Sequence, residues 1–186
     1  KDQFEVIRYA GSLPMLDMRW DPQVQGITPA DWDEIIALDS LLMGTDRSSL
    51  LRQLLAENQA DGQRRLQAMK DKLGDDLDQV PGASIYRRED GRIIGYCFSR
   101  RGSHGLFLGP CAAMTSNAAS AMLTTQAAYQ LGGDVIIDIP AGNRYANEWA
   151  RRMHLKVQRT LTRMCRGRMV REDVWKLWAS SGPEKG

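Results

Sequence analysis

The spacing of apolar and polar positions changes along this chain, and each kind of spacing predicts a strand or a helix. Residues 4–10 (FEVIRYA) alternate apolar and polar side chains, which is typical of a strand with one buried face. Residues 104–110 (HGLFLGP) and 134–140 (DVIIDIP) are nearly continuous apolar runs, as in strands buried on both faces. Residues 156–166 (KVQRTLTRMCR) alternate again. We therefore predict a strand in each of these places.

Helix signals lie between and beyond these strands. Thr28 can cap a helix whose apolar positions keep helical spacing until Gly44 ends it, and Asp46 is placed to cap a second helix. A turn of small residues follows the first apolar run and predicts a third helix. Asn143 opens a fourth. The apolar residues between 173 and 178 predict a short terminal helix.

The middle of the chain is its most polar part. Residues 57–82 remain rich in helix formers, and we interpret them either as a solvent-facing helical extension or as a mobile insertion that Pro81-Gly82 ends. Residues 83–87 and 92–100 are predicted strands, and Asp90-Gly91 between them is a strong hairpin signal.

The order of these elements predicts an α/β (α+β) fold, a mixed sheet with helices on both faces. Residues 1–25 are interpreted as the end of a preceding domain or a linker strand. Residues 26–170 form the main domain, which contains the polar insertion. Residues 171–186 are predicted to be a C-terminal helix and tail.

The amino-acid composition favours a globular protein and does not favour one that binds nucleic acid. The chain has 186 residues, 42% of them hydrophobic and 26% charged, as expected for one globular domain with appendages. Basic residues crowd the C-terminal third, where they form either a solvated face or a polyanion site. Nucleic acid is not the expected partner, because the net charge is only +2 and no aromatic–basic interleaving occurs.

Cysteines and apolar runs bear on location and metal binding. The three cysteines form no CxxC or Cys/His cluster, so we expect no metal site and a reducing, cytoplasmic environment. No apolar run reaches the roughly 20 residues that span a bilayer, so we expect no membrane segment.

Several motifs resemble a known superfamily. Asn143 and Ala146 follow strand 134–140 as the N-x-x-A motif does at the fourth helix of the GNAT (Gcn5-related N-acetyltransferase) superfamily. Met153-His154-Leu155 stands where many members carry Leu-Gly-Phe, and residues 109–123 occupy the place of the cofactor-binding strand, turn and helix. Residues 27–167 therefore resemble a GNAT domain, which implies the acyl-CoA N-acyltransferase fold.

A narrower resemblance rests on five short motifs in order. They are LDSLLMGTDR (38–47), GY (95–96), LGPCAA (108–113), DIPAGN (138–143) and RMCRG (163–167). Together they resemble the C-terminal domain of the YitH/HSE-type acetyltransferases, which carry two GNAT-like domains in tandem. This resemblance implies an N-terminal GNAT domain of the same protein as a partner. A homodimer is a further expectation.

The resemblance also implies a cofactor site. Acetyl-CoA would lie between strands 104–110 and 134–140, where an amine attacks the thioester directly. Backbone groups of the first strand would pair with the pantetheine arm, and amides at the start of the next helix would hold the pyrophosphate. The residues so implied are Leu108, Gly109, Cys111, Ala112, Met114, Thr115, Ser116, Asn117, Ala118 and Asn143.

Two positions depart from the superfamily pattern. The glycine-rich loop Gln/Arg-x-x-Gly-x-Gly/Ala is replaced around Thr115-Ser116-Asn117, which forms either a cofactor cradle or a structural turn. The tyrosine that many members use as a general acid is Ala150 here.

Four further residues are candidates for catalysis or acceptor binding. His104 and Asp138 are candidate bases; His104 is alternatively a surface residue, and Asp138 either a satisfied structural group or a substrate anchor. The first two helices flank the acceptor cleft in this fold, so Asp46 could bind an amine and Arg47 an acidic group. Alternatively, Asp46 is only a helix cap and Arg47 a solvated side chain.

The resulting functional hypothesis is an acetyl-CoA-dependent N-acetyltransferase that acetylates a primary amine on a small molecule or a lysine side chain. The alternative is a degenerate GNAT domain without catalysis of its own, which serves as a dimerisation or substrate-recognition module.

Overall fold

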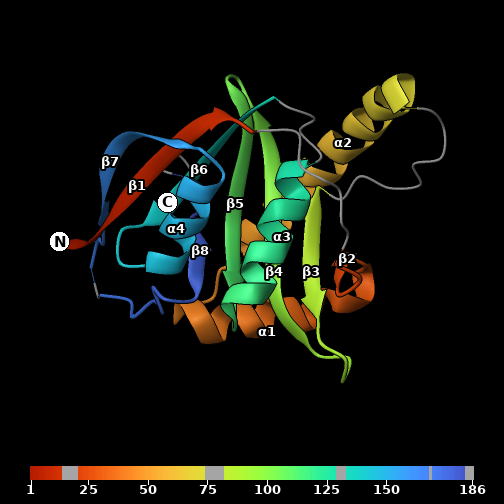
Figure 1. Ribbon diagram of the computed structural model, residues 1–186. Helices are drawn as coiled ribbons and strands as arrows, with labels where there is room; N and C mark the ends of the chain where they lie inside the picture. Colours follow the sequence, from red (N-terminus) through yellow and green to blue (C-terminus); the bar gives the residue numbers. More distant parts are fainter. Residues whose placement is uncertain (14–20, 74–81, 129–132, 168, 183–186) are drawn as a thin grey trace.

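The computed structural model describes residues 1–13, 21–73, 82–128, 133–167 and 169–182. Within them lies one mixed sheet of eight strands (Figure 1). Its order is β2 (Val24–Gly26), β3 (Ala83–Arg87), β4 (Ile93–Gly102), β5 (Gly105–Ala113), β6 (Asp134–Pro140), β1 (Asp2–Ser12) and β7 (Lys156–Met164), with β8 (Leu177–Ala179) pairing with β5 off this path. Of these pairs, β5–β6 is parallel and the others are antiparallel.

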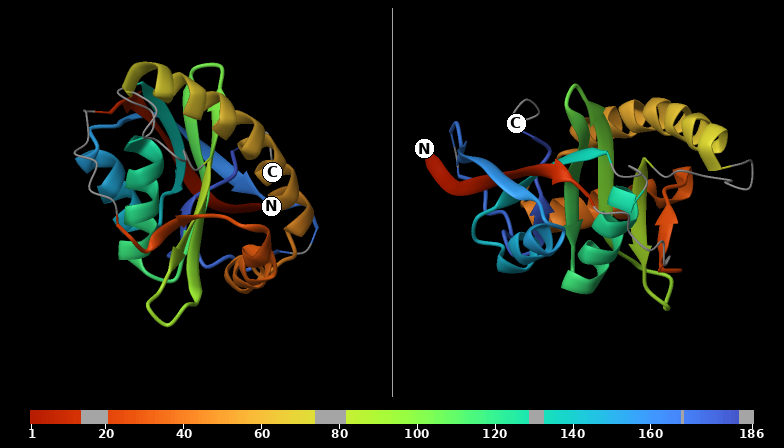
Figure 2. Two further views of the ribbon diagram at one scale, coloured as in Figure 1. Left: turned by 90° about the vertical axis from the view of Figure 1, so that its right-hand side faces the viewer. Right: turned by 45° about the horizontal axis from the view of Figure 1, so that its top comes forward.

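Helices cover both faces of this sheet. A short 3-10 turn, η1 (Pro29–Asp31), leads into α1 (Trp32–Met43), which packs with α2 (Ser48–Leu73) against β4. On the other face, α3 (Ser116–Ala128) packs over β3, β4 and β5, and α4 (Arg144–Arg152) packs over β6. The left view of Figure 2 shows the two helix layers on opposite sides of the sheet. The predicted fold class is confirmed.

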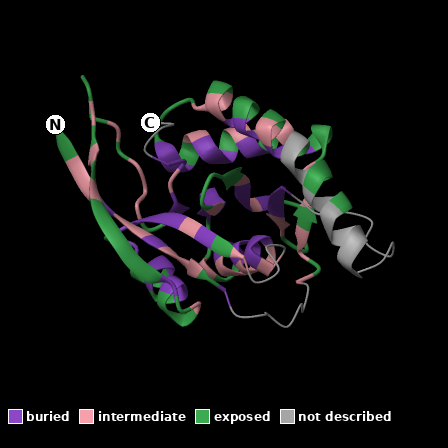
Figure 3. Cartoon of the chain, turned by 90° about the horizontal axis from the view of Figure 1, so that it is seen from above, coloured by how far each residue is buried: buried purple, intermediate pink, exposed green. Residues whose placement is uncertain are grey.

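Each helix layer closes its own hydrophobic core, and buried residues gather where helices meet the sheet (Figure 3). The core under α3 and α4 includes Met122, Trp149 and Ile137. The core under α1 and α2 includes Ile35 and Phe98. Successive residues of a strand point to opposite faces, so Val135, Ile137 and Ile139 of β6 enter the first core while Asp138 faces the other side.

Most local predictions agree with the structure. Gly44 ends α1 with φ 65°, and its amide donates to the Ser40 carbonyl at 3.0 Å. The hairpin turns at Asp90-Gly91, where Gly91 has φ 86°. The polar middle is helical as far as Leu73 in α2; residues 74–81 lie outside the described part of the chain. No helix in the described residues is long and apolar enough to cross a membrane.

The N-terminal segment is an inner strand of this sheet. β1 lies between β6 and β7, and pairs antiparallel with both. Residues 2–12, interpreted from the sequence as part of a preceding domain or a linker, therefore belong to the sheet of this domain. Sequence alternation identified the strand, but its neighbours are more than 120 residues away and could not be read from it.

The predicted terminal helix is wrong. Residues 174–176 form a turn, and Leu177–Ala179 form β8. Leu177 is buried in the core under α1 and α2, whereas Trp178 is buried in the core under α3 and α4. Leu177, Trp178 and Ala179 form a continuous apolar run, as in a strand that is buried on both faces. It is too short to be distinguished from a helical turn by sequence alone.

Candidate functional site

The strands β5 and β6 separate where the sequence predicts a cofactor. Their parallel register runs from Leu106 opposite Val135 to Leu108 opposite Ile137 and then ends. The remaining residues of β5 turn away from β6. This divergence creates the crevice that the resemblance implies, at the carboxyl ends of two parallel strands.

The chain's own strand β8 fills this crevice. Cys111 lies opposite Ala179 and Ala112 opposite Leu177, in antiparallel pairing with β5. The Ala113 amide donates to the Lys176 carbonyl at 3.1 Å. On the other side, the Ser180 amide donates to the Asp138 carbonyl of β6 at 2.8 Å. Backbone groups implied to bind pantetheine are thus bonded to the protein itself.

Gly109 makes this close approach possible. It has φ 139°, a conformation that side chains disfavour, and a Cβ added there would collide with the Ser180 carbonyl and crowd the Ala179 side chain. Leu108 is buried beside it. The predicted cofactor-binding strand therefore packs against residues 179–180.

Asn143 holds β8 in place. Its Oδ1 caps α4 by accepting from the Ala146 amide at 3.1 Å, as the sequence motif predicts. Its Nδ2 donates to the Trp175 carbonyl at 3.1 Å and to the Leu177 carbonyl at 2.9 Å. This residue, implied as cofactor-binding, contacts the segment that occupies the crevice.

The implied pyrophosphate cradle lies at the exposed N-terminus of α3. Met114, Thr115 and Asn117 are exposed, whereas Ala118 is buried. Two of the amides already have partners: Met114 N–H donates to the Ile94 carbonyl at 2.7 Å, and Ala118 N–H donates to Thr115 Oγ1 at 3.3 Å. Residues 114–118, which include Ser116, lie together at the start of α3. Their role in cofactor binding stays a prediction.

The two candidate bases lie at opposite ends of the parallel pair. His104 is exposed in the turn before β5, at the amino ends of the strands. Asp138 follows the last paired residue of β6, at the carboxyl end. The structure does not bring them together, and His104 lies away from the crevice.

Asp138 is bound by an arginine that sequence reasoning missed. Arg8 of β1 lies directly opposite Asp138 in the antiparallel register. Its Nε donates to Asp138 Oδ1, and its Nη2 donates to Oδ2, both at 2.7 Å. Both side chains are largely buried. Of the two interpretations of Asp138, the satisfied structural group agrees with this geometry, although the residue also lines the pocket described below.

Arg47 and Asp46 have different surroundings. Asp46 is exposed and accepts from the Ser48 amide at 2.8 Å, so it begins α2. Arg47 donates to both carboxylate oxygens of Asp39, at 3.1 and 2.5 Å, and to the Tyr96 hydroxyl at 3.0 Å. Burial raises the pKa of the Tyr96 phenol well above its usual range even though Arg47 lowers it, so the phenol stays neutral and donates to Asp39.

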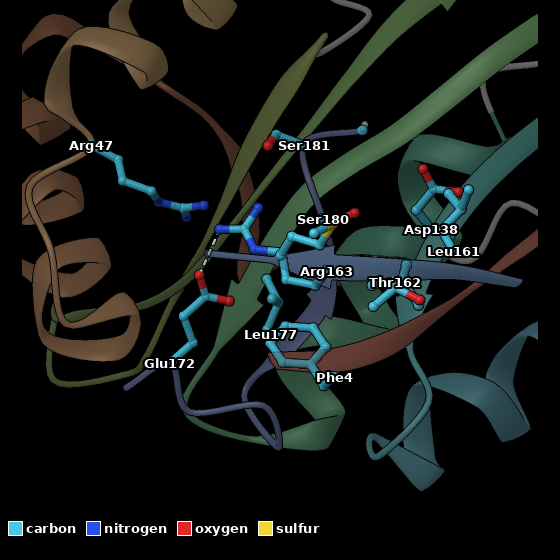
Figure 4. A pocket seen from close by; sticks show the side chains of 13 residues that line it. Phe4, Arg47, Asp138, Leu161, Thr162, Arg163, Glu172, Leu177, Ser180 and Ser181 are labelled. Atoms are coloured by element: carbon cyan, nitrogen blue, oxygen red, sulfur yellow. Dashed lines mark hydrogen bonds and ion pairs between the residues drawn. The ribbon is translucent and has the colours of Figure 1, made fainter. Parts of the chain in front are cut away.

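A pocket of about 260 Å³ opens beside the filled crevice (Figure 4). We call it the Arg47–Arg163 pocket, after two arginines whose side chains point toward one another in it. Arg163 of β7 donates to Glu172 Oε1 at 2.7 Å. The sequence signals for Arg163 were the RMCRG motif and the crowding of basic residues in the C-terminal third. The residues that line the pocket are Phe4, Val6, Arg47, Asp138, Leu161, Thr162, Arg163, Met164, Glu172, Leu177, Ser180, Ser181 and Gly182.

Residues 35–179 match the model of a protein family described as an acetyltransferase (GNAT) domain. Among solved structures, a candidate acetyltransferase from Pyrococcus horikoshii is 22% identical with a TM-score of 0.63, covering 100% of this chain and 53% of that one. A GCN5-related N-acetyltransferase from Sphaerobacter thermophilus is 13% identical with a TM-score of 0.56, covering 87% and 51%. The chain thus spans about half the length of these relatives. A comparison with proteins of curated function gave no match.

The family match confirms the predicted superfamily, whose domain is described as an acetyltransferase. The solved structures agree with it in fold. Members of this family generally use acetyl-CoA. The narrower resemblance to the C-terminal domain of tandem acetyltransferases stays a prediction.

Proposed function

The chain belongs to the GNAT acetyltransferase family, and on that premise we propose that it is the acceptor-recognition half of an acetyl-CoA-dependent N-acetyltransferase. The whole protein would transfer an acetyl group to a primary amine. A second GNAT-like domain, predicted to precede this one, would bind acetyl-CoA. This half would hold the acceptor.

One observation carries this proposal: β8 occupies the β5–β6 crevice. Pantetheine would need backbone groups that already pair with residues 176–180. In this arrangement the residues present do not fit acetyl-CoA. Binding would first have to remove Trp178 from its buried site, at a cost of about 3–5 kcal/mol for that side chain alone.

The lengths of the related structures are consistent with a second domain. The chain covers 53% of the Pyrococcus protein and 51% of the Sphaerobacter protein. Relatives of this size have room for another unit as large as this chain.

A second candidate function is favoured by the exposed start of α3. Thr115 and Asn117 remain accessible there, so a pyrophosphate could reach the predicted cradle. In that case β8 would leave the crevice and this half would transfer the acetyl group itself.

The variant Thr115→Asp separates the two candidates in the longer protein. Aspartate also caps helices, so α3 should be retained while the cradle gains a negative charge. Ser103→Asp is the matched control, because it adds the same charge to the exposed turn before β5. We expect the KM for acetyl-CoA of the two variants to agree within about twofold. A rise of roughly tenfold or more for Thr115→Asp alone would support the second candidate and contradict the first.

A further inference from the structure

We propose that the Arg47–Arg163 pocket binds the carboxylate of a small molecule, and that the acceptor is therefore an amine that also carries a carboxylate, such as an amino acid. The binding site is inferred from the pocket alone. Its role as an acceptor site rests on the proposed function.

Four charged side chains line the pocket: the donors Arg47 and Arg163, and the carboxylates Asp138 and Glu172, each of which already accepts from an arginine. The side chains of Arg47 and Arg163 are 12% and 27% exposed, whereas their partners Asp39 and Glu172 are 1% and 4% exposed. Asp39 lies outside the lining and Glu172 is almost fully buried within it, so both carboxylates fix the orientation of a guanidinium that is more exposed than they are. A guanidinium binds a carboxylate through two parallel N–H bonds, so this arrangement suits a carboxylate ligand.

Both guanidiniums keep the capacity to bind an anion. Burial alone would lower the pKa of Arg47, but Tyr96, Asp39 and Glu172 raise it, so Arg47 stays charged. The Nε of Arg163 is buried and has no hydrogen-bond partner within the described residues. The two side chains converge on the same space beside Glu172 (Figure 4). A ligand carboxylate there would reduce the repulsion between two like charges.

Size and the remaining walls restrict the ligand further. A volume of about 260 Å³ lies just below the range of roughly 300–1,000 Å³ typical of small-molecule pockets, which favours a ligand of amino-acid size. Phe4, Val6, Leu161 and Leu177 provide an apolar wall. Thr162, Ser180 and Ser181 add hydroxyl groups. A carboxylate with a short apolar body matches these surfaces.

The position of the pocket links it to the crevice. Asp138 and Leu177 line the pocket, and the Asp138 carbonyl and β8 also close the crevice. A ligand in the pocket would therefore lie beside the carboxyl end of β6. This is the edge of the sheet where open α/β folds bind ligands.

The test is a titration of the chain with L-leucine, followed by amide NMR signals of residues 161–164 and 180–182. L-leucinamide lacks the carboxylate, and inorganic phosphate tests whether any anion suffices. We expect leucine to shift these signals saturably and leucinamide to bind at least about tenfold more weakly. Arg163→Gln should weaken leucine binding by at least roughly tenfold. Arg159→Gln is the control on the same strand, an exposed arginine outside the pocket, and should bind as the wild type does.

Two results would overturn the carboxylate site: no saturable shift with leucine, or equal leucine binding by Arg163→Gln and Arg159→Gln. Phosphate binding as tight as that of leucine would replace the carboxylate with a general anion and also overturn it. If Arg163→Gln does not fold, Leu161→Glu places a negative charge on the apolar wall and should abolish leucine binding.

The acceptor role is decided separately in the longer protein, where Arg163→Gln should raise the acceptor KM by about tenfold and leave the acetyl-CoA KM unchanged. Leucine binding without this change would retain the site and reject the proposed function.

Discussion

The β5–β6 crevice and the Arg47–Arg163 pocket adjoin one another but differ in what occupies them. The crevice is filled by Leu177–Ala179, whose backbone pairs with β5. The pocket remains open, and two arginines line it. On the proposed function, the crevice lies where the fold family binds its cofactor but is closed by the chain itself. In this domain, the space for a ligand lies beside the crevice.

Two buried ion pairs hold the walls of the open pocket in place. Arg8 and Asp138 join β1 to β6, and Arg47, just before α2, is joined to Asp39 of α1; Asp138 and Arg47 line the pocket. Each carboxylate is buried and is bonded through both oxygens. The pocket is thus preorganised by groups that a ligand does not need to reorder.

The largest expected effect concerns the strand in the crevice. Trp178→Ala should lower the free energy of unfolding by about 4 kcal/mol, because it leaves a large cavity in the core. Trp175→Ala is the matched control, since Trp175 is 59% exposed and Trp178 only 2%. Urea denaturation would measure both. Equal losses would contradict the placement of β8 in the crevice.

The next largest expected loss of stability concerns the Arg8–Asp138 ion pair. Asp138→Asn should cost about 3 kcal/mol, because Arg8 would keep its charge in a largely buried site. Asp134→Asn on the same strand is exposed and should cost less than about 1 kcal/mol. The double variant Arg8→Met/Asp138→Leu should recover most of the loss. A double variant that is no more stable than Asp138→Asn would show that the pair is not the cause.

A smaller effect should test whether Asn143 holds β8 as well as capping α4. Asn143→Asp keeps an oxygen that caps α4 but loses the donor to the Trp175 and Leu177 carbonyls, whereas Asn143→Ala loses both. We expect losses of about 2 kcal/mol for each, because the aspartate charge faces two carbonyl oxygens. If Asn143→Asp is as stable as the wild type, Asn143 does not hold β8.

The smallest expected effect concerns Asp31, which lies away from both the crevice and the pocket and contributes to the loss of stability at low pH. Burial alone would raise the pKa of Asp31, but hydrogen bonds from Thr28 and Arg87 outweigh it and hold the pKa below its usual value. Its contribution to stability is therefore complete above about pH 4 and is lost as the pH falls through the lowered value. Asp31→Asn should flatten this acid decline in urea midpoints, whereas the exposed Asp33→Asn should follow the wild type.

Local sequence signals predicted most elements because their causes are local. Asn143 caps α4 through its own neighbour Ala146, and Gly44 ends α1 through a bond to Ser40. The run DVIIDIP coincides with β6. Each of these features depends on residues only a few positions apart, so a local sequence pattern can predict it.

The candidate site was predicted only in part because its contacts are distant in sequence. Asp138 was singled out, but its partner Arg8 is 130 residues away. Arg47 was singled out, but Tyr96 and the pocket residues of β7 were not. The use of residues 177–179 as a strand depends on the gap between β5 and β6, which no local pattern reveals.

The most direct test of the central claim is amide hydrogen exchange at Ala113 and Ser180 with and without acetyl-CoA. These two amides donate to Lys176 and Asp138, on either side of the filled crevice. If β8 belongs to the folded domain, both should exchange slowly, with opening free energies near that of global unfolding. Saturating acetyl-CoA should leave them unchanged. Faster exchange of the Ser180 amide that rises saturably with acetyl-CoA would mean that the cofactor displaces β8, and would contradict the account.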